Sequence, residues 1–157
     1  MTTATSRLPQ VGEEAPDFTL PSTSGSDVSL ASFRNSSAVL VAFFPLAFTG
    51  TCTTEMCAFS EDFDVFADKG VTVLPVSVDS VPTLREFASK YELRTPLLSD
   101  FKRELSSSWG LLRETFASER AYILIDRSGV VRWVHVEDVP SNRRENEEIL
   151  ARIAELP

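Results

Sequence analysis

Two cysteines are the residues in this chain whose type and spacing best support chemistry. Cys52 and Cys57 are the only cysteines among 157 residues, and four residues separate them. Thr49 stands three positions before Cys52, and Pro45 stands four positions before Thr49. Because the thiolate is the reactive form of cysteine, a nucleophilic cysteine needs neighbours that stabilise a negative charge. A threonine hydroxyl beside Cys52 can hydrogen-bond the thiolate or hold an incoming oxygen.

The segments around Cys52 predict that it opens a helix after a buried strand. Residues 38–44 are a continuous apolar run, which is typical of a central strand covered on both faces. From residue 52 to residue 69, apolar side chains recur at steps of three and four, as in an amphipathic helix. Thr49 or Thr51 can cap the start of this helix. Free N–H groups and the helix dipole in the first turn stabilise an anion, and the apolar stripe places Cys52 towards the core.

The remaining segments predict an α/β fold of the thioredoxin type. Strands are expected where residues are apolar or alternate between apolar and polar: residues 17–20, 28–30, 38–44, 71–78, a short stretch within 95–100, 121–126 and 130–136. Helices are expected at residues 52–69, 80–91 and 142–156, whereas residues 102–110 are ambiguous between helix and loop. The first two strands form an N-terminal β-hairpin, and the last two form a closing hairpin. This order predicts a central mixed sheet flanked by helices.

Composition limits the number of domains and the classes of partner. A chain of 157 residues that is 43% hydrophobic suits one domain, which we place at residues 11–157 after a flexible lead-in at residues 1–10. A net charge of −8 argues against nucleic-acid binding, which depends on clustered Lys and Arg. No apolar run is long enough to span a bilayer, and the N-terminus lacks the apolar core of a signal peptide. The simplest location is therefore the cytoplasm.

Neither a disulfide scaffold nor a metal site explains the two cysteines. In a chain expected to be intracellular, a cysteine pair is more often catalytic or metal-binding than structural. A structural zinc needs about four ligands, and the only histidine, His135, lies far from the cysteines along the chain. We therefore expect no metal and no organic cofactor. Cys52 as an inert packed residue is an alternative, against which its position at the helix start and Thr49 both argue.

The motif Pro45-x-x-x-Thr49-x-x-Cys52 resembles the active-site signature of the peroxiredoxins, and Glu55 fits its usual continuation. Further similar landmarks follow the family order and extend the resemblance over nearly the whole chain; they are residues 15–18, 96–100 and 120–129. The run at residues 43–50 is most similar to alkyl hydroperoxide reductase E. The spacing of Cys57 instead resembles the bacterioferritin comigratory protein, or peroxiredoxin Q, group.

The resemblance implies a thiol-dependent peroxidase that reduces hydrogen peroxide and small organic hydroperoxides through a sulfenic acid at Cys52. By position, Thr49 would bind the peroxide oxygens, and Arg120 would stabilise the thiolate and the developing charge. Glu55 would orient Arg120 through an ion pair, and Pro45 would shape and shield the pocket. Electrons would come from a thioredoxin- or glutaredoxin-like protein. The resemblance leaves a monomer and a homodimer open.

Cys57 is either the resolving cysteine or a packed small residue. If both cysteines are helical, their Cα atoms lie about 8–9 Å apart, whereas disulfides rarely bridge more than about 7 Å. A Cys52–Cys57 bond would therefore require the first helical turns to unwind, which the peroxiredoxin Q resemblance implies. Otherwise an external thiol would resolve the sulfenic acid. We favour the resolving role, because such a partner is commonly poised beside a sensor cysteine.

Two other functions would use the same residues. A dithiol–disulfide exchange protein on this fold typically carries Cys-x-x-Cys at the helix start, a shorter spacing than the one found here. A peroxide sensor, redox relay or holdase would oxidise a partner protein through Cys52 without turnover. Steady-state turnover with an added reductant separates the peroxidase from this second alternative.

Overall fold

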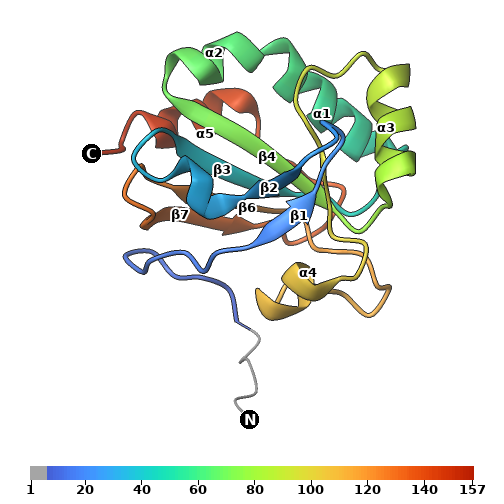
Figure 1. Ribbon diagram of the computed structural model, residues 1–157, viewed down its shortest axis with the longest axis horizontal. Coiled ribbons are helices and arrows are strands. Elements are labelled where there is room, and N and C mark those ends of the chain that lie inside the picture. Colours follow the sequence, from blue (N-terminus) through green and yellow to red (C-terminus); the bar gives the residue numbers. More distant parts are fainter. Residues whose placement is uncertain (1–6) are drawn as a thin grey trace.

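A five-stranded mixed sheet forms the centre of the computed structural model, which describes residues 7–157 (Figure 1). Its strands in chain order are β3 (Ala38–Phe43), β4 (Val71–Ser77), β5 (Leu98–Ser99), β6 (Ala121–Ile125) and β7 (Val131–Val136). They lie side by side in the order β5-β4-β3-β6-β7. β3, β4 and β5 are parallel, whereas β6 is antiparallel to β3 and β7 is antiparallel to β6. The expected central mixed sheet and closing hairpin are confirmed.

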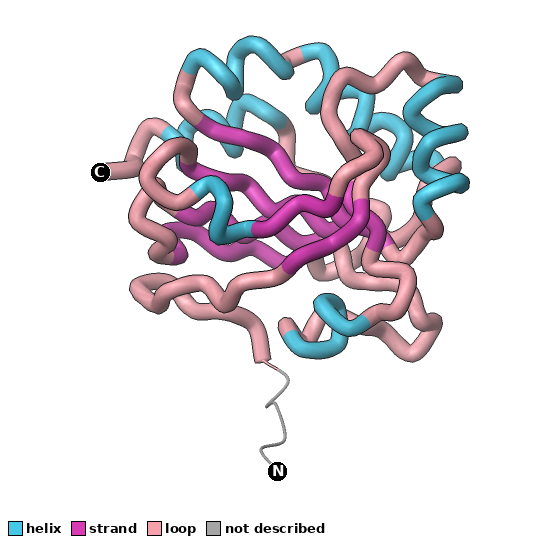
Figure 2. The backbone as a smooth tube through the Cα atoms, viewed as in Figure 1, coloured by secondary structure: helices cyan, strands magenta, loops and turns pink. Residues whose placement is uncertain are grey.

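Helices cover one face of this sheet, and the N-terminal hairpin with two short helices covers the other. The helical layer contains α1 (Gly50–Glu61), α2 (Phe63–Asp68), α3 (Val81–Lys90) and α5 (Asn146–Ile153). The second layer contains β1 (Thr19–Pro21), β2 (Asp27–Ser29), the 3-10 helix η1 (Leu30–Phe33) and α4 (Glu104–Ser108). Figure 2 shows that loops make up much of this second layer. The expected α/β fold of the thioredoxin type is therefore confirmed.

The strand before the cysteines is buried on both faces. All six residues of β3 are buried. Leu40 and Ala42 pack against the helical layer, whereas Val39 and Val41 pack against the hairpin layer. This division follows from the strand geometry, because successive side chains point to opposite faces of a sheet. The central position of β3 thus fixes the place where the turn to α1 begins.

The single helix expected at residues 52–69 is wrong, because the structure has two helices there. α1 begins at Gly50, and the helix breaks at Asp62, whose φ and ψ are −95° and 16°. The side chain of Asn146 from α5 lies at this break. Its Nδ2 donates to the carbonyl oxygen of Ala58 at 3.0 Å and to Oδ2 of Asp62 at 2.8 Å. A side chain inserted beside the helical hydrogen bonds is a common cause of such an interruption.

The two ends of the chain also differ in detail from what the sequence predicts. α5 spans Asn146–Ile153 instead of residues 142–156, because the preceding residues form a loop that hydrogen-bonds to side chains near Cys52. At the N-terminus, residues 1–6 of the expected lead-in lie outside the described part of the chain. Arg7 already contacts the domain, since its N–H donates to the carbonyl oxygen of Ser108 at 3.1 Å. The division between lead-in and domain stays a prediction.

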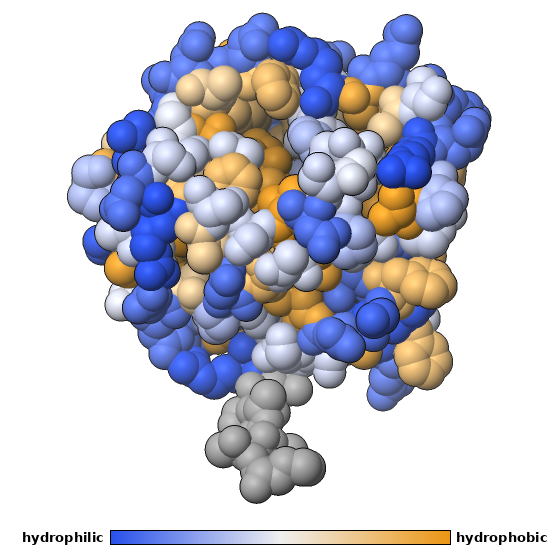
Figure 3. Space-filling model, viewed as in Figure 1, coloured by the Kyte–Doolittle hydropathy of each residue, from blue (hydrophilic) through white to orange (hydrophobic). Residues whose placement is uncertain are grey.

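An apolar groove of about 460 Å³ lies between the junction of α1 and α2 and the N-terminal hairpin, and it is visible in orange below α2 (Figure 3). Its apolar lining includes Val28, Phe33, Phe59, Phe63 and Phe66. Cys52 is absent from this lining, so the groove and the cysteine are separate features. Within residues 7–157, no helix is both long and apolar enough to cross a membrane.

Candidate active site

Cys52 lies in the first turn of α1 with its side chain facing the core. The residue is 1% exposed and packs in the same apolar cluster as Met56 and Phe59. The N–H of Thr53 makes the first bond of this helix, to the carbonyl oxygen of Thr49 at 2.9 Å. The N–H groups before Thr53 therefore have no acceptor within the helix, and together with the helix dipole they favour a negative charge nearby. The expected position of Cys52, at a helix start and facing the core, is confirmed.

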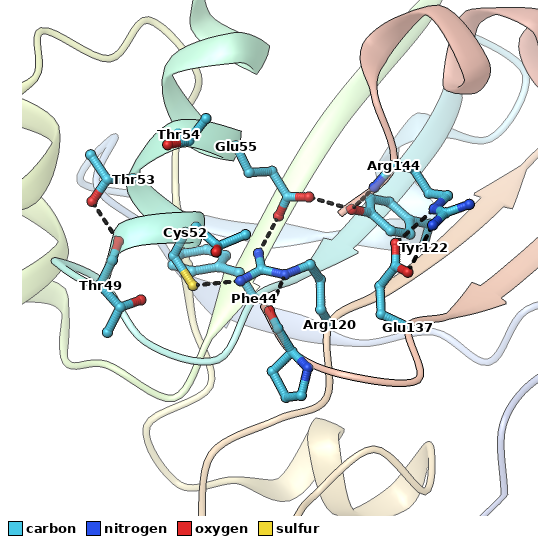
Figure 4. Close-up of polar contacts among 12 residues, drawn as sticks. Phe44, Thr49, Cys52, Thr53, Thr54, Glu55, Arg120, Tyr122, Glu137 and Arg144 are labelled. Atoms are coloured by element: carbon cyan, nitrogen blue, oxygen red, sulfur yellow. Dashed lines mark hydrogen bonds and ion pairs between the residues drawn. The ribbon is translucent and has the colours of Figure 1, made fainter. Parts of the chain in front are cut away.

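Arg120 hydrogen-bonds Cys52 and two further acceptors, one in the same helix and one in the loop after β7 (Figure 4). Its Nη2 donates to Sγ of Cys52 at 3.0 Å, and its Nη1 donates to Oε1 of Glu55 at 2.7 Å. Its Nε donates to the carbonyl oxygen of Pro140 at 2.9 Å. Burial alone would lower the pKa of Arg120, but its interactions with Glu55 and Cys52 outweigh burial and raise it. The guanidinium is thus a fixed positive charge at the sulfur.

Glu55 is a buried carboxylate held from both sides. Its side chain is fully buried; Oε1 accepts from Arg120, and Oε2 accepts from the hydroxyl of Tyr122. Burial raises the pKa of Glu55, and Arg120 and the Tyr122 hydroxyl oppose that rise. Burial, and then the nearby charge of Glu55, raises the pKa of Tyr122. Tyr122 therefore keeps its proton and acts as a hydrogen-bond donor.

The turn before α1 carries Pro45 and Thr49. The Thr49 hydroxyl donates to the carbonyl oxygen of Leu46 at 2.7 Å, and Thr51 donates to the carbonyl oxygen of Ser141 at 3.2 Å. Thr49 is the N-cap residue of α1, but its side chain accepts no capping hydrogen bond, and Thr51 lies within the helix. The expected side-chain cap is therefore wrong. With its proton committed to Leu46, the Thr49 oxygen can accept a hydrogen bond from another group. Pro45 is half-buried at the start of the same turn.

The conformation of this turn is unusual and is held from two neighbouring loops. Phe48 has a φ of 67°, a left-handed conformation that is costly for a bulky residue. The N–H of Ala47 donates to Oδ2 of Asp79 at 2.8 Å. The hydroxyl of Ser118 donates to the carbonyl oxygen of Phe44 at 3.2 Å. These contacts fix the approach of the chain to Cys52.

The sequence of this chain also matches a known protein family. A model of the AhpC/TSA family matches residues 11–134. This chain belongs to that family, the peroxiredoxins. Alkyl hydroperoxide reductase E of Mycobacterium tuberculosis is 35% identical over 130 residues, which are 81% of this chain and 85% of the relative. Peroxiredoxin Q of Oryza sativa subsp. japonica is also 35% identical, over 127 residues that are 79% of this chain and 58% of the relative. These equal identities do not assign this peroxiredoxin to either subgroup.

A solved structure supports the same relationship. The reduced 2-Cys peroxiredoxin of Plasmodium vivax superposes with a TM-score of 0.85 and 32% sequence identity, covering 92% of this chain and 80% of that one. The protein is accordingly a thiol-dependent peroxidase, an oxidoreductase. The relationship does not favour the sensor, relay or holdase that the sequence alone leaves open. Within the described range 7–157, no group of three or more His, Cys, Asp or Glu side chains could hold a metal ion.

Cys57 of this peroxiredoxin lies in the same helix as Cys52, and both thiols are free. α1 is continuous between them, so helix geometry puts their Cα atoms about 8–9 Å apart. Burial raises the pKa of the half-buried Cys57 thiol, and the nearby Glu61 raises it further. Cys57 is therefore mainly a protonated thiol at neutral pH in this conformation.

The structure brings Cys52, Glu55 and Arg120 together as the sequence predicts, and it adds partners that the sequence does not reveal. Tyr122 has a detectable signal, because it follows Arg120 by two positions at the start of β6, and this spacing in an extended chain puts two side chains on the same face. The carbonyl groups of Pro140 and Ser141 have no such signal, since any residue supplies a carbonyl oxygen. Asp79 and Ser118 act on main-chain atoms of the turn at residues 44–47, and neither has a motif around it.

Proposed function

We propose that Cys52 is the peroxidatic cysteine of this peroxidase. The observation that supports this role best is the 3.0 Å contact between Nη2 of Arg120 and Sγ of Cys52 at the start of a helix. A guanidinium and free helical N–H groups both stabilise a thiolate, and only the thiolate attacks a peroxide efficiently. The substrates are hydrogen peroxide and small organic hydroperoxides. Because Cys52 is almost fully buried, the reacting end of the substrate must be small.

The proposed step is a displacement at oxygen. The Cys52 thiolate attacks one oxygen of ROOH, an S–O bond forms and the O–O bond breaks. The sulfur is oxidised to a sulfenic acid, and the released RO⁻ takes a proton to give water or an alcohol. Arg120 has further N–H groups besides those in its three contacts, and one of them can stabilise the negative charge that grows on the leaving oxygen.

Thr49 and Pro45 complete the proposed site. Because the Thr49 hydroxyl donates to Leu46, it accepts the hydrogen bond from the O–H of the peroxide and orients the substrate. Pro45 fixes the backbone of the turn through its restricted φ and excludes water from one side of the pocket. Glu55 orients Arg120 through their ion pair of 2.7 Å.

The catalytic cycle then requires thiols. A second thiol attacks the sulfenic acid, an S–S bond forms and water leaves; a thioredoxin- or glutaredoxin-like dithiol reduces the disulfide. We propose Cys57 as this second thiol, with an external thiol as the alternative. Several relatives carry names that refer to two cysteines, including the Plasmodium vivax protein. A homodimer and a monomer are both compatible with this cycle. We place the protein in the cytoplasm.

The test is stopped-flow oxidation of the reduced protein by hydrogen peroxide. Wild type and Cys57→Ser should react orders of magnitude faster than free cysteine, because both keep Cys52 and Arg120. Cys52→Ser should show no fast phase. If wild type reacts no faster than free cysteine, Cys52 is not a peroxidatic residue. Steady-state consumption of peroxide with thioredoxin and its reductase then tests the cycle.

A further inference from the structure

Tyr122 is a polar residue placed in the middle of an apolar layer. It lies in β6 between Ala42 of β3 and His135 of β7, and it is fully buried in the helical-side core. Its ring stacks on Trp133, with centroids 5.9 Å apart and planes at 22°. A phenolic hydroxyl in such a place needs hydrogen-bond partners, and its two partners are Glu55 and the backbone of Arg144.

The direction of the Tyr122 proton follows from these two partners. The backbone N–H of Arg144 can only donate, and it donates to the Tyr122 oxygen at 2.9 Å. The single phenolic proton is therefore available for Oε2 of Glu55. Since Oε1 of Glu55 already accepts from Arg120, both carboxylate oxygens receive a donor. This arrangement suits an ionised Glu55, which accepts hydrogen bonds and donates none.

Arg120 is the first hydrogen-bond donor to Glu55 and Tyr122 is the second, because the other charged side chains nearby are directed to other partners. Arg143 is close enough to lower the pKa of Glu55 through its charge, but its Nη2 donates to Glu145. The side chain of Arg144 is directed to Glu137, which also faces His135. Arg120 faces Glu55 on one side and Cys52 on the other.

We propose that Tyr122 is a positioning residue for the peroxidase reaction: its hydroxyl keeps Glu55 ionised, and the ionised Glu55 holds the Arg120 guanidinium against the sulfur of Cys52. This inference rests on the proposed role of Cys52. Tyr122 hydrogen-bonds Glu55 and not the sulfur of Cys52, so its effect on the reaction passes through Glu55. Without the hydroxyl, one oxygen of the fully buried Glu55 carboxylate has no donor, which favours protonation of Glu55. Protonation then removes the ion pair that fixes Arg120.

The test compares Tyr122→Phe with wild type in the rate of oxidation by hydrogen peroxide. Loss of the donor raises the pKa of Glu55 further, so Glu55 is neutral at low pH and ionised again at high pH. We expect Tyr122→Phe to be about tenfold slower at about pH 5.5 and within about twofold of wild type at about pH 8.5. Tyr91→Phe removes a phenolic hydroxyl from the C-cap residue of α3, outside this network, and should match wild type at both pH values.

The double variant shows whether Tyr122 acts through Glu55. Glu55→Gln should be slow at all pH values, and adding Tyr122→Phe should slow it no further. A deficit of Tyr122→Phe that is constant with pH, or that persists in the Glu55→Gln background, would overturn the proposal in favour of a packing role. Wild-type rates at the level of free cysteine would instead contradict the role of Cys52 itself.

Infrared spectroscopy tests the state of Glu55 without any peroxide. Reduced Tyr122→Phe should show a protonated-carboxyl band at low pH that disappears at high pH. This band should appear in addition to the carboxyl signal that wild type and the Glu55→Gln/Tyr122→Phe double variant show at the same pH. A missing band in Tyr122→Phe would show that Glu55 stays ionised without the tyrosine, and the proposal would be wrong whatever the peroxidase rates.

Discussion

A single side chain, Arg120, donates to three acceptors in two segments: Cys52 and Glu55 of α1, and the carbonyl group of Pro140 in the loop after β7. Only a planar guanidinium can donate in these three fixed directions at once, because the ammonium of lysine is a compact charge on a flexible stem. We expect Arg120→Lys to reduce the rate constant for oxidation of Cys52 by about 100-fold, since one acceptor or more loses its donor. Stopped-flow fluorescence or competition with a second peroxidase measures this rate.

The matched control for Arg120→Lys is Arg85→Lys on the exposed side of α3. It makes the same chemical change far from the network, and we expect the wild-type rate. A rate for Arg120→Lys within twofold of wild type would mean that charge alone activates Cys52, and that the directional contacts have no part in the reaction.

Among single residues, the sequence predicts those that belong to the motif and misses those that contact the site from elsewhere in the chain. Cys52, Thr49 and Glu55 lie within seven positions, and Arg120 is found through its own similar segment. The contact between Thr51 and Ser141 joins residues 90 positions apart. Such contacts depend on how α1 and the loop after β7 pack, and local residue patterns carry no information on that packing.

At the scale of one element, α1 both activates Cys52 and separates it from Cys57. If Cys57 is the resolving residue, one equivalent of peroxide should give a Cys52–Cys57 disulfide and faster amide hydrogen exchange in residues 50–61, because the helix must unwind. Mass spectrometry after pepsin digestion measures both. α3 serves as the internal reference, and its exchange should not change.

Cys57→Ser is the control for this experiment, because it can be oxidised only at Cys52. It should accumulate a sulfenic acid without faster exchange in α1. A persistent sulfenic acid in wild type would show that an outside thiol resolves Cys52. A disulfide that forms with unchanged exchange would contradict the geometry of a rigid α1.

The junction of α1 and α2 has its own stabilising contact, the two hydrogen bonds from Asn146. In Asn146→Ala the carbonyl oxygen of Ala58 and the carboxylate of Asp62 each lose a donor in a largely buried place. We expect the free energy of unfolding to fall by about 1–2 kcal/mol. Urea denaturation measures this change, and the exposed Asn142→Ala should stay within about 0.5 kcal/mol of wild type. Equal losses in both variants would refute the role of Asn146.

Strands were easier to predict than the ends of helices. β3 and the hairpin of β6 and β7 are marked by apolar runs and a turn within the sequence itself. The break at Asp62 depends on Asn146, which is 84 positions away, so the local three- and four-residue pattern continues through it. The start of α5 likewise depends on loop contacts with Thr51 and Tyr122.

For the molecule as a whole, Asp126 links stability to pH through the turn between β6 and β7. Burial would raise the pKa of Asp126, but hydrogen bonds from Ser128, Arg132 and Val130 outweigh burial and lower the pKa to about 2. A carboxylate with a lowered pKa in the folded state stabilises the fold above its ordinary pKa, near about 4. That stabilisation disappears as the pH falls from about 4 towards about 2.

We therefore expect Asp126→Asn to be about 1–2 kcal/mol less stable than wild type at pH 7, with the difference shrinking as the pH falls below about 4. Urea unfolding at several pH values measures this. Asp68→Asn, at an exposed position in α2, is the matched control and should follow the wild-type curve. A difference for Asp126→Asn that is the same at pH 7 and at about pH 3 would show that the turn needs the shape of the aspartate and not its charge.

The interruption at Asp62 determines how much of the molecule must take part in a redox cycle. Beyond the break, α2 is anchored in the core by a buried residue of its own, Phe66, which is 1% exposed. α1 can therefore behave as a separate cooperative unit, whose opening leaves α2 and the sheet folded. Each turnover through Cys57 would then unfold and refold only about three helical turns. The free energy needed for that rearrangement would then be the local stability of those turns and not the stability of the whole protein.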